Sequence, residues 1–228
     1  MKNKFGFILV KPQLGENIGA CARSMKNFGF SKLYIVEPKI AFPNHKTKAT
    51  SVGAYDIINK AKVFKNIEDA IDPFNLVISL SARQRDINKK HISLNEFQEI
   101  IKKKSLNVGL MFGPEASGLS NKDLSLSNYI LQIPTSTKFK SLNLSHSLTV
   151  ICYEIFKVLN EKKITKNKSN IKISSKSKIS IIVRHLINLL EEKDFFKPKE
   201  KKHSMLLNIN NLIYRFEPND KELRILAS

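Results

Sequence analysis

Apolar residues gather in five short runs within the first two thirds of the chain, and these runs predict β-strands. Each run is rich in Val, Ile and Leu and ends in proline, glycine or polar residues. Strands whose apolar residues are nearly continuous are usually covered on both faces, as in a parallel sheet. The predicted strands span residues 5–10, 33–36, 76–80, 108–112 and 129–133.

Between these runs the apolar residues recur every three or four positions, which predicts amphipathic helices. Residues 18–28 form one such helix, and Gly29 follows it as a C-terminal cap. Ser93 and Glu96 have the spacing of a capping box at the start of another. Residues 144–159 carry the apolar stripe of a long third helix. The alternation of strands and helices favours an open α/β sheet.

The composition changes near residue 160. All eight glycines lie at or before Gly118, and residues 157–178 hold eight lysines and a single acid, Glu161. Helical patterns resume at 179–189 and 205–216, and a last short helix is predicted from Asn219, with Leu223 and Leu226 as its apolar face. We therefore predict an α/β domain (1–160), a lysine-rich linker (161–178) and a small all-helical C-terminal extension (179–228).

Neither a membrane span nor a secretory leader is predicted. No run reaches the roughly 18 apolar residues that a span needs. The basic start and its short apolar run are followed at once by Lys11 and Pro12, without a cleavage site, so a buried first strand explains them better. Cys21 and Cys152 lie far apart within apolar helical patterns and are predicted to be small buried hydrophobes. We expect a cytoplasmic protein without a disulfide or zinc site.

The chain carries a formal net charge of +19, from 39 Lys and Arg against 20 Asp and Glu. Such an excess attracts polyanions, with nucleic acid first and anionic membrane second. General enrichment in lysine is the alternative explanation, but it does not account for acidic residues at half the basic number. The charge therefore favours a nucleic-acid partner.

The first polar group with candidate chemistry follows the first predicted strand. Gly15 and Gly19 surround a helix start, where small residues and free backbone N–H groups permit close approach of an anionic ligand. Arg23 points about 140° away from Ile18 around the helix, at 100° per residue. Arg23, with Asn17 beside it, is a candidate for holding a phosphate or polarising a hydroxyl. The alternative is an ordinary surface arginine.

The second and third groups follow later predicted strands. Gly113, Pro114 and Glu115, closed by Gly118, place a carboxylate at the carboxyl edge of the sheet, where open α/β sheets bind ligands. The alternative is a plain turn with a solvated glutamate. Ser141 and Asn143 precede the long helix and are suited to contact a ribose, although helix capping alone explains both.

Taken together and in this order, the three groups resemble the motifs of the SpoU/TrmH-type RNA 2′-O-methyltransferases of the SPOUT superfamily. Asn17 and Arg23 match the first motif, 113–118 the second, and 133–143 the third, so that the resemblance covers roughly residues 5–158. Residues 79–83 and the ending at 221–226 look like the TrmJ group of that family. This group modifies the ribose of nucleotide 32 in the tRNA anticodon loop.

The resemblance implies a mostly parallel sheet whose C-terminal part forms a deep trefoil knot, a homodimer, tRNA as substrate and S-adenosylmethionine as cofactor, with no metal needed for the chemistry. No G-x-G-x-x-G follows a predicted strand, so a Rossmann-type cofactor site has no support. Two departures from the family are Leu80, where a small or hydroxylated residue is common, and His146, for which a helix-surface position is the alternative. The implied cofactor contacts are Leu80, Ser81, Ala82, Gly113, Ile133, Ser141, Leu142 and Asn143.

The family also implies a role for each polar residue in the methylation of a ribose 2′-OH. Arg23 acts either as the base or as an anchor for the adjacent phosphate, since a guanidinium is almost always protonated. Asn17 orients Arg23 or the ribose, Glu115 positions a neighbouring group, and Ser141 and Asn143 bridge cofactor and RNA. The alternatives are another tRNA position, ribosomal RNA, a non-catalytic RNA-binding protein on the same scaffold, and a generic α/β nucleotide-binding enzyme.

Overall fold

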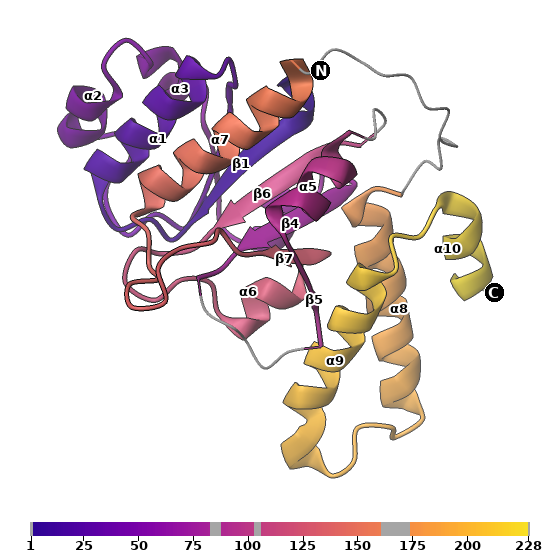
Figure 1. Cartoon of the computed structure of the whole chain (residues 1–228). Helices are drawn as coiled ribbons and strands as arrows, with labels where there is room; N and C mark the ends of the chain where they lie inside the picture. Colours follow the sequence, from indigo (N-terminus) through magenta and orange to yellow (C-terminus); the bar gives the residue numbers. More distant parts are fainter. Residues whose placement is uncertain (1, 83–87, 103–105, 161–173, 228) are drawn as a thin grey trace.

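A seven-stranded sheet forms the centre of the protein (Figure 1). The computed structural model describes every residue except 1, 83–87, 103–105, 161–173 and 228. The strand order is β3-β2-β1-β6-β4-β7-β5, and all the described pairings are parallel. The strands are β1 (Phe5–Val10), β2 (Lys32–Val36), β3 (Lys62–Phe64), β4 (Leu76–Leu80), β5 (Lys90–Ile92), β6 (Val108–Phe112) and β7 (Tyr129–Leu131).

Helices cover both faces of the sheet and make a three-layer α/β/α arrangement. Strand β1 shows why both faces need a cover, because Phe7 and Leu9 enter one apolar core while Ile8 and Val10 enter the other. One face packs against α1 (Gly15–Asn27), α3 (Tyr55–Asn59), α5 (Leu94–Ile101) and α7 (Leu144–Asn160), with α2 (His45–Ser51) lying on α1. The other packs against α4 (Ile67–Ile71), α6 (Asn121–Ser125), α8 (Lys176–Glu192), α9 (Lys202–Arg215) and α10 (Asp220–Ala227). Short 3-10 helices span Lys2–Lys4 and Lys199–Lys201.

All five predicted strands are present, with small differences at their ends. Strand β2 begins at Lys32, and β7 ends at Leu131, so that Ile133 lies in the following loop. The hydrophobic pattern missed β3 and β5, the two edges of the sheet. Each has three residues and begins with a lysine, which suits an exposed edge but hides the strand from a pattern search.

Local signals for helix ends are confirmed. Gly29 follows α1 with φ of +76°, and Phe30 N–H donates to the Met25 carbonyl at 2.8 Å, the pattern of a Schellman cap. The capping box at Ser93 and Glu96 is present at the start of α5. Helix α1 itself begins at Gly15, three residues before the predicted range.

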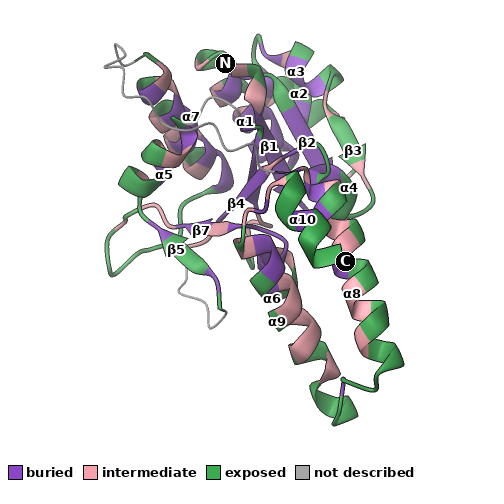
Figure 2. Cartoon of the chain, turned by 90° about the vertical axis from the view of Figure 1, so that its right-hand side faces the viewer, coloured by how far each residue is buried: buried purple, intermediate pink, exposed green. Residues whose placement is uncertain are grey.

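The C-terminal helices cover part of one face of the sheet. Helix α8 begins at Lys176, inside the predicted linker, whose residues 161–173 lie outside the described part of the chain. Asn128 on the sheet side accepts the Val77 N–H at 2.9 Å and donates to the Tyr214 carbonyl on α9 at 2.6 Å. Figure 2 shows buried positions where α8 and α9 meet the body and exposed ones at their far ends. Removal of these helices would therefore expose one face of the core.

The two cysteines and the last helix were also predicted to bury apolar side chains. Cys21 and Cys152 are fully buried free thiols, as predicted, and burial raises the pKa of both, so neither is a nucleophile. Leu223 of α10 is buried, but Leu226 is 54% exposed, so only half of the predicted apolar face of this helix is covered. Within the described ranges, no helix is long and apolar enough to cross a membrane, and no three His, Cys, Asp or Glu side chains are placed to hold a metal ion.

Candidate active site

The loops that follow β4, β6 and β7 enclose a cleft of about 550 Å³ at the carboxyl edge of the sheet. This size lies within the range of small-molecule sites, and the position is the one at which open α/β sheets bind ligands. Asn143 lies at the start of α7, outside the described lining of the cleft. The other predicted cofactor contacts all line it: Leu80, Ser81, Ala82, Gly113, Ile133, Ser141 and Leu142.

The loop after β6 is folded tightly on itself, and Gly113 makes this possible. A Cβ at Gly113 would lie 2.3 Å from the Leu119 nitrogen, inside the backbone of the returning loop. Gly118 closes the loop with φ of +68°, and its N–H donates to the Pro114 carbonyl at 2.8 Å. The predicted turn is thus a compact wall of the cleft.

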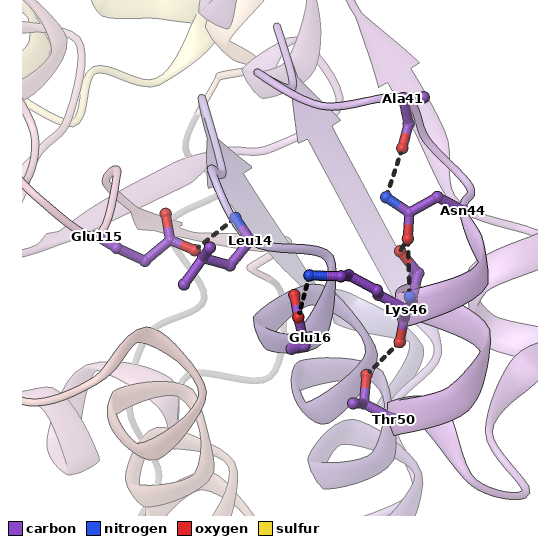
Figure 3. A network of polar contacts seen from close by, with 8 residues as sticks. Leu14, Glu16, Ala41, Asn44, Lys46, Thr50 and Glu115 are labelled. Carbon is purple, nitrogen blue, oxygen red and sulfur yellow. Dashed lines mark hydrogen bonds and ion pairs between the residues drawn. The ribbon is translucent and has the colours of Figure 1, made fainter.

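Glu115 joins this loop to the start of α1. One carboxylate oxygen accepts the Gln13 N–H at 2.9 Å, and the other accepts the Asn17 amide at 2.9 Å. That second oxygen also accepts the Leu14 N–H at 3.3 Å, the contact drawn in Figure 3. The Gln13 side chain in turn accepts the Ala116 N–H at 3.2 Å. A negative charge at a helix N-terminus is favourable, so Glu115 acts as a distant cap of α1. The alternative of a solvated glutamate in a plain turn is wrong.

Asn17 and Asn143 continue the connection to α7. The Asn143 amide donates to Asn17 Oδ1 at 3.0 Å, and Asn143 Oδ1 accepts both the Ser145 N–H at 2.8 Å and the Ser145 hydroxyl at 2.7 Å. Asn143 is therefore the N-cap of α7, as the capping alternative held, and it also bonds to α1. Glu115, Asn17 and Asn143 form one hydrogen-bonded chain that joins the three motif segments.

The remaining two candidate catalytic residues, Ser141 and Arg23, are not part of this hydrogen-bonded series. Ser141 lines the cleft and is exposed. Arg23 is exposed on α1 and is not among the described residues that line the cleft. It follows Asn17 by six residues, which is about 9 Å along the helix axis. Within one copy of the chain, no described hydrogen bond or ion pair joins Arg23 to the other motif residues. His146 is exposed on α7, as its surface alternative held.

The interpretation of Gly15 and Gly19 as places of ligand approach is wrong. A Cβ at Gly19 would lie 2.1 Å from Thr50 Oγ1 and 2.4 Å from the Thr47 carbonyl, and one at Gly15 would lie 2.7 Å from Asn44. Because neither glycine has a side chain, helix α2 can pack closely against α1 at these two positions. Figure 3 shows this contact, where Lys46 of α2 pairs with Glu16 of α1 at 2.8 Å.

Among the cleft residues that sequence reasoning missed are Thr137, Lys138 and Lys140, which line it from the loop between β7 and α7. Neither lysine forms an ion pair with any residue that the structure describes. The signal that could have revealed them is the sequence Lys138-Phe139-Lys140, two cations around an aromatic residue just before the third motif.

A replacement of Glu115 by glutamine tests the capping role. Glutamine has only one acceptor oxygen, so at least one of the two backbone N–H groups loses its partner. Both bonds are exposed and water can replace the acceptor, so the loss is about 0.5–1.5 kcal/mol. For a chain of this size we expect the melting temperature to fall by roughly 1–6 °C. Glu192→Gln, an exposed position on α8, is the matched control. Equal melting of the two variants in calorimetry would contradict the capping role.

Parallel strands, helices on both faces and a ligand-sized cleft over the strand ends define an α/β protein whose sheet edge is suited to a small molecule. The sequence model of the SpoU rRNA Methylase family matches residues 4–153, and the chain belongs to this family. The resemblance inferred from the three motifs is thereby confirmed.

Relatives match along nearly the whole chain. The tRNA (cytidine-2′-O-)-methyltransferase TrmJ of Methanocaldococcus jannaschii is 33% identical over 227 residues, which is 97% of this chain and 96% of that protein. The crystal structure of TrmJ from Z. mobilis superposes with a TM-score of 0.88 at 29% identity, covering 97% of this chain and 95% of that one. The SpoU methyltransferase AviRb of Streptomyces viridochromogenes, solved with the cofactor AdoMet, shares the fold at a TM-score of 0.57 and 19% identity.

Proposed function

We propose that this protein transfers a methyl group from S-adenosylmethionine to a ribose 2′-OH of tRNA, at nucleotide 32 of the anticodon loop. The observation that carries the proposal is the hydrogen-bonded chain from Glu115 through Asn17 to Asn143, which joins all three motif segments beside one cleft. Full-length similarity to proteins named as tRNA 2′-O-methyltransferases supports the substrate, and the charge of +19 suits a polyanion. The cytoplasm is the proposed location.

The cleft fits S-adenosylmethionine in size and in character. The tight turn at Gly113, where a side chain has no room, brings the backbone of Gly113 and Gly118 into the lining of the cleft. Leu80, Ile133 and Leu142 offer apolar surface for an adenine ring, and Ser81 and Ser141 offer polar groups. When bound, the cofactor supplies an electrophilic methyl group on a sulfonium. The carboxylate of Glu115, which also lines the cleft, is a favourable neighbour for that positive charge.

We also propose that the C-terminal part of the sheet is threaded as a trefoil knot. The strand order supports it, because β7 lies between β4 and β5, two strands that precede it in the chain. The segment between β7 and α7 then carries Ile133, Ser141 and Leu142 to the cleft. Such threading fixes the cofactor loops against one another.

The protein's own contribution to the reaction is alignment and removal of the hydroxyl proton. Asn17 and Asn143 are locked to each other and to Glu115, so they present a fixed polar edge to the ribose. Ser141 lies between the cleft and solvent and bridges cofactor and RNA. Arg23, being a protonated guanidinium, holds the phosphate beside the ribose and eases loss of the proton. Because Arg23 lies outside the cleft of its own copy, we propose a homodimer in which it serves the cleft of the other.

Incubation with unmodified tRNA and labelled S-adenosylmethionine tests the proposed activity. We expect one methyl group per tRNA, located on a ribose 2′-OH at nucleotide 32 by nuclease digestion and mass mapping. A methyl group at another tRNA ribose would correct the position, and incorporation into ribosomal RNA alone would correct the substrate. Protein that binds the methyl donor and tRNA but transfers nothing would establish the non-catalytic alternative.

A further inference from the structure

Phe139 presents its ring to solvent between two residues that line the cleft. Its side chain is 79% exposed, the largest value among the large hydrophobic residues that the structure describes. Burying such a ring is worth about 1.5–3 kcal/mol, so an exposed one indicates a surface that gains from a partner. The neighbouring loop residues on both sides, Lys138 and Lys140, line the cleft.

The backbone around Phe139 is held in a turn. Phe139 N–H donates to the Ser136 carbonyl at 3.2 Å, Lys138 N–H donates to the Ser136 hydroxyl at 3.3 Å, and the Thr135 hydroxyl donates to the Lys140 carbonyl at 3.1 Å. These bonds fix the direction of the chain at the tip of the loop. The exposure of the ring is therefore a property of an ordered turn.

The chemistry of this tip matches unpaired nucleic acid. Proteins bind single-stranded RNA through aromatic rings on which bases stack and through cations that contact the phosphates. Lys138 and Lys140 supply two cations without an ion-pair partner among the described residues, and Phe139 supplies the ring between them. A wholly apolar partner would leave both charges uncompensated, so the combination favours a flat, anionic ligand.

We propose that Phe139 stacks on an unpaired base of the substrate RNA, next to the ribose being methylated, while Lys138 and Lys140 contact the flanking phosphates. This inference rests on the proposed function, because it places the RNA at the mouth of the methyl-donor cleft. Phe139 is then a positioning residue that helps hold the ribose at the cleft without touching the reacting atoms. The stacking requires an aromatic ring and no particular base.

Three substitutions separate stacking from mere bulk. Stacking is worth about 1–3 kcal/mol per base, so Phe139→Ala and Phe139→Leu should raise the Kd for tRNA roughly 5- to 100-fold. Phe139→Tyr keeps the ring and should bind as the wild type does. The Kd for S-adenosylmethionine, measured by calorimetry, should not change in any of them. Phe216→Ala removes another exposed ring, 66% exposed at the C-terminal end of α9 and outside the described lining of the cleft, and should leave tRNA affinity unchanged.

Abasic RNA identifies the partner of the ring. An anticodon stem-loop with an abasic site placed at each loop position in turn should contain one position at which the wild type binds more weakly but Phe139→Ala shows no further loss. We expect this position to be the methylated nucleotide or a direct neighbour. Additive losses at every loop position would overturn the stacking proposal.

Other outcomes also decide the matter. Unchanged tRNA affinity in Phe139→Ala, with an active wild type, would refute the inference and leave the proposed function standing. A parallel loss of methyl-donor affinity would make the ring a cover of the donor, and a change of oligomeric state in light scattering would make it a contact between copies. A wild type that binds the stem-loop through Phe139 but transfers no methyl group would refute the proposed function alone.

Discussion

Replacing Arg23 by alanine is expected to lower the rate of methyl transfer by a factor of about 100 to 10,000, while the affinity for S-adenosylmethionine stays the same. That range is the usual contribution of a group that assists proton transfer in the transition state. Arg23 is exposed on α1 and does not belong to the described lining of the cleft, so its loss disturbs neither the core nor the donor site. Single-turnover kinetics and donor binding by calorimetry measure the two effects separately.

The placement of Arg23 makes a second result of the same experiment informative. If Arg23 serves the cleft of another copy, an inactive Arg23→Ala chain mixed with an inactive chain that carries a cleft substitution such as Gly113→Ala should regain up to about a quarter of the wild-type activity. Lys26→Ala, three residues further along α1, is the control and should keep full activity. Equal loss of turnover and donor binding in Arg23→Ala would mean that the residue is structural.

Replacing Lys176 by methionine is expected to raise the melting temperature by roughly 5–10 °C at pH 7. Lys176 is fully buried at the start of α8, and its Nζ has no hydrogen-bond partner among the described residues. Burial lowers the pKa of Lys176 from 10.5 to about 7, an effect that the nearby Glu217 opposes and the nearby Lys89 reinforces. At 1.36 kcal/mol per pKa unit, this shift corresponds to a penalty on the order of 5 kcal/mol for the charged side chain. Methionine removes this penalty, but it also removes the contact of Lys176 Nζ with the Tyr214 ring, 5.2 Å from the ring centroid, so the net gain in stability is smaller.

The buried Lys176 also makes the stability of the protein depend on pH. Because the pKa of Lys176 is lower in the folded state, the unfolded chain binds more protons between about pH 7 and 10.5. The contribution of Lys176 to stability therefore improves as the pH rises through this window and is least favourable below pH 7. Lys176→Met should abolish this slope, whereas Lys178→Met, which removes an exposed ion pair with Asp220, should keep it. A wild type and a Lys176→Met variant with equal stability at pH 6.5 would contradict the prediction.

The elements that the sequence predicted correctly are those whose signals lie within a few residues. The apolar runs of β1, β4 and β6 read as buried strands because both of their faces are covered. Gly29 and the pair Ser93 and Glu96 marked helix ends because caps are made by adjacent residues. The three motifs could be assigned to a family in the same way, since each is a short stretch of chain.

Contacts between distant segments could not be predicted in this way. The two edge strands have only three residues each, and their hydrogen bonds come from β2 and β7 rather than from their own sequence. Gly19 looked suited to a ligand, but its partner is helix α2, about thirty residues away along the chain. Lys176 looked like part of a solvated linker, although its backbone pairs with Phe74 and its side chain is enclosed.

The sequence by itself determined the strands at the centre of the sheet, the helix ends, the basic charge and the family of this protein, because each of these is encoded in local patterns or in composition. Only the tertiary structure decided that Glu115 caps a helix a hundred residues earlier in the chain, that Asn17 and Asn143 bond to each other, and that Arg23 lies outside the described lining of the cleft. The physical reason is that a hydrogen bond depends on distance in space, and a chain of this length can bring almost any two polar side chains together.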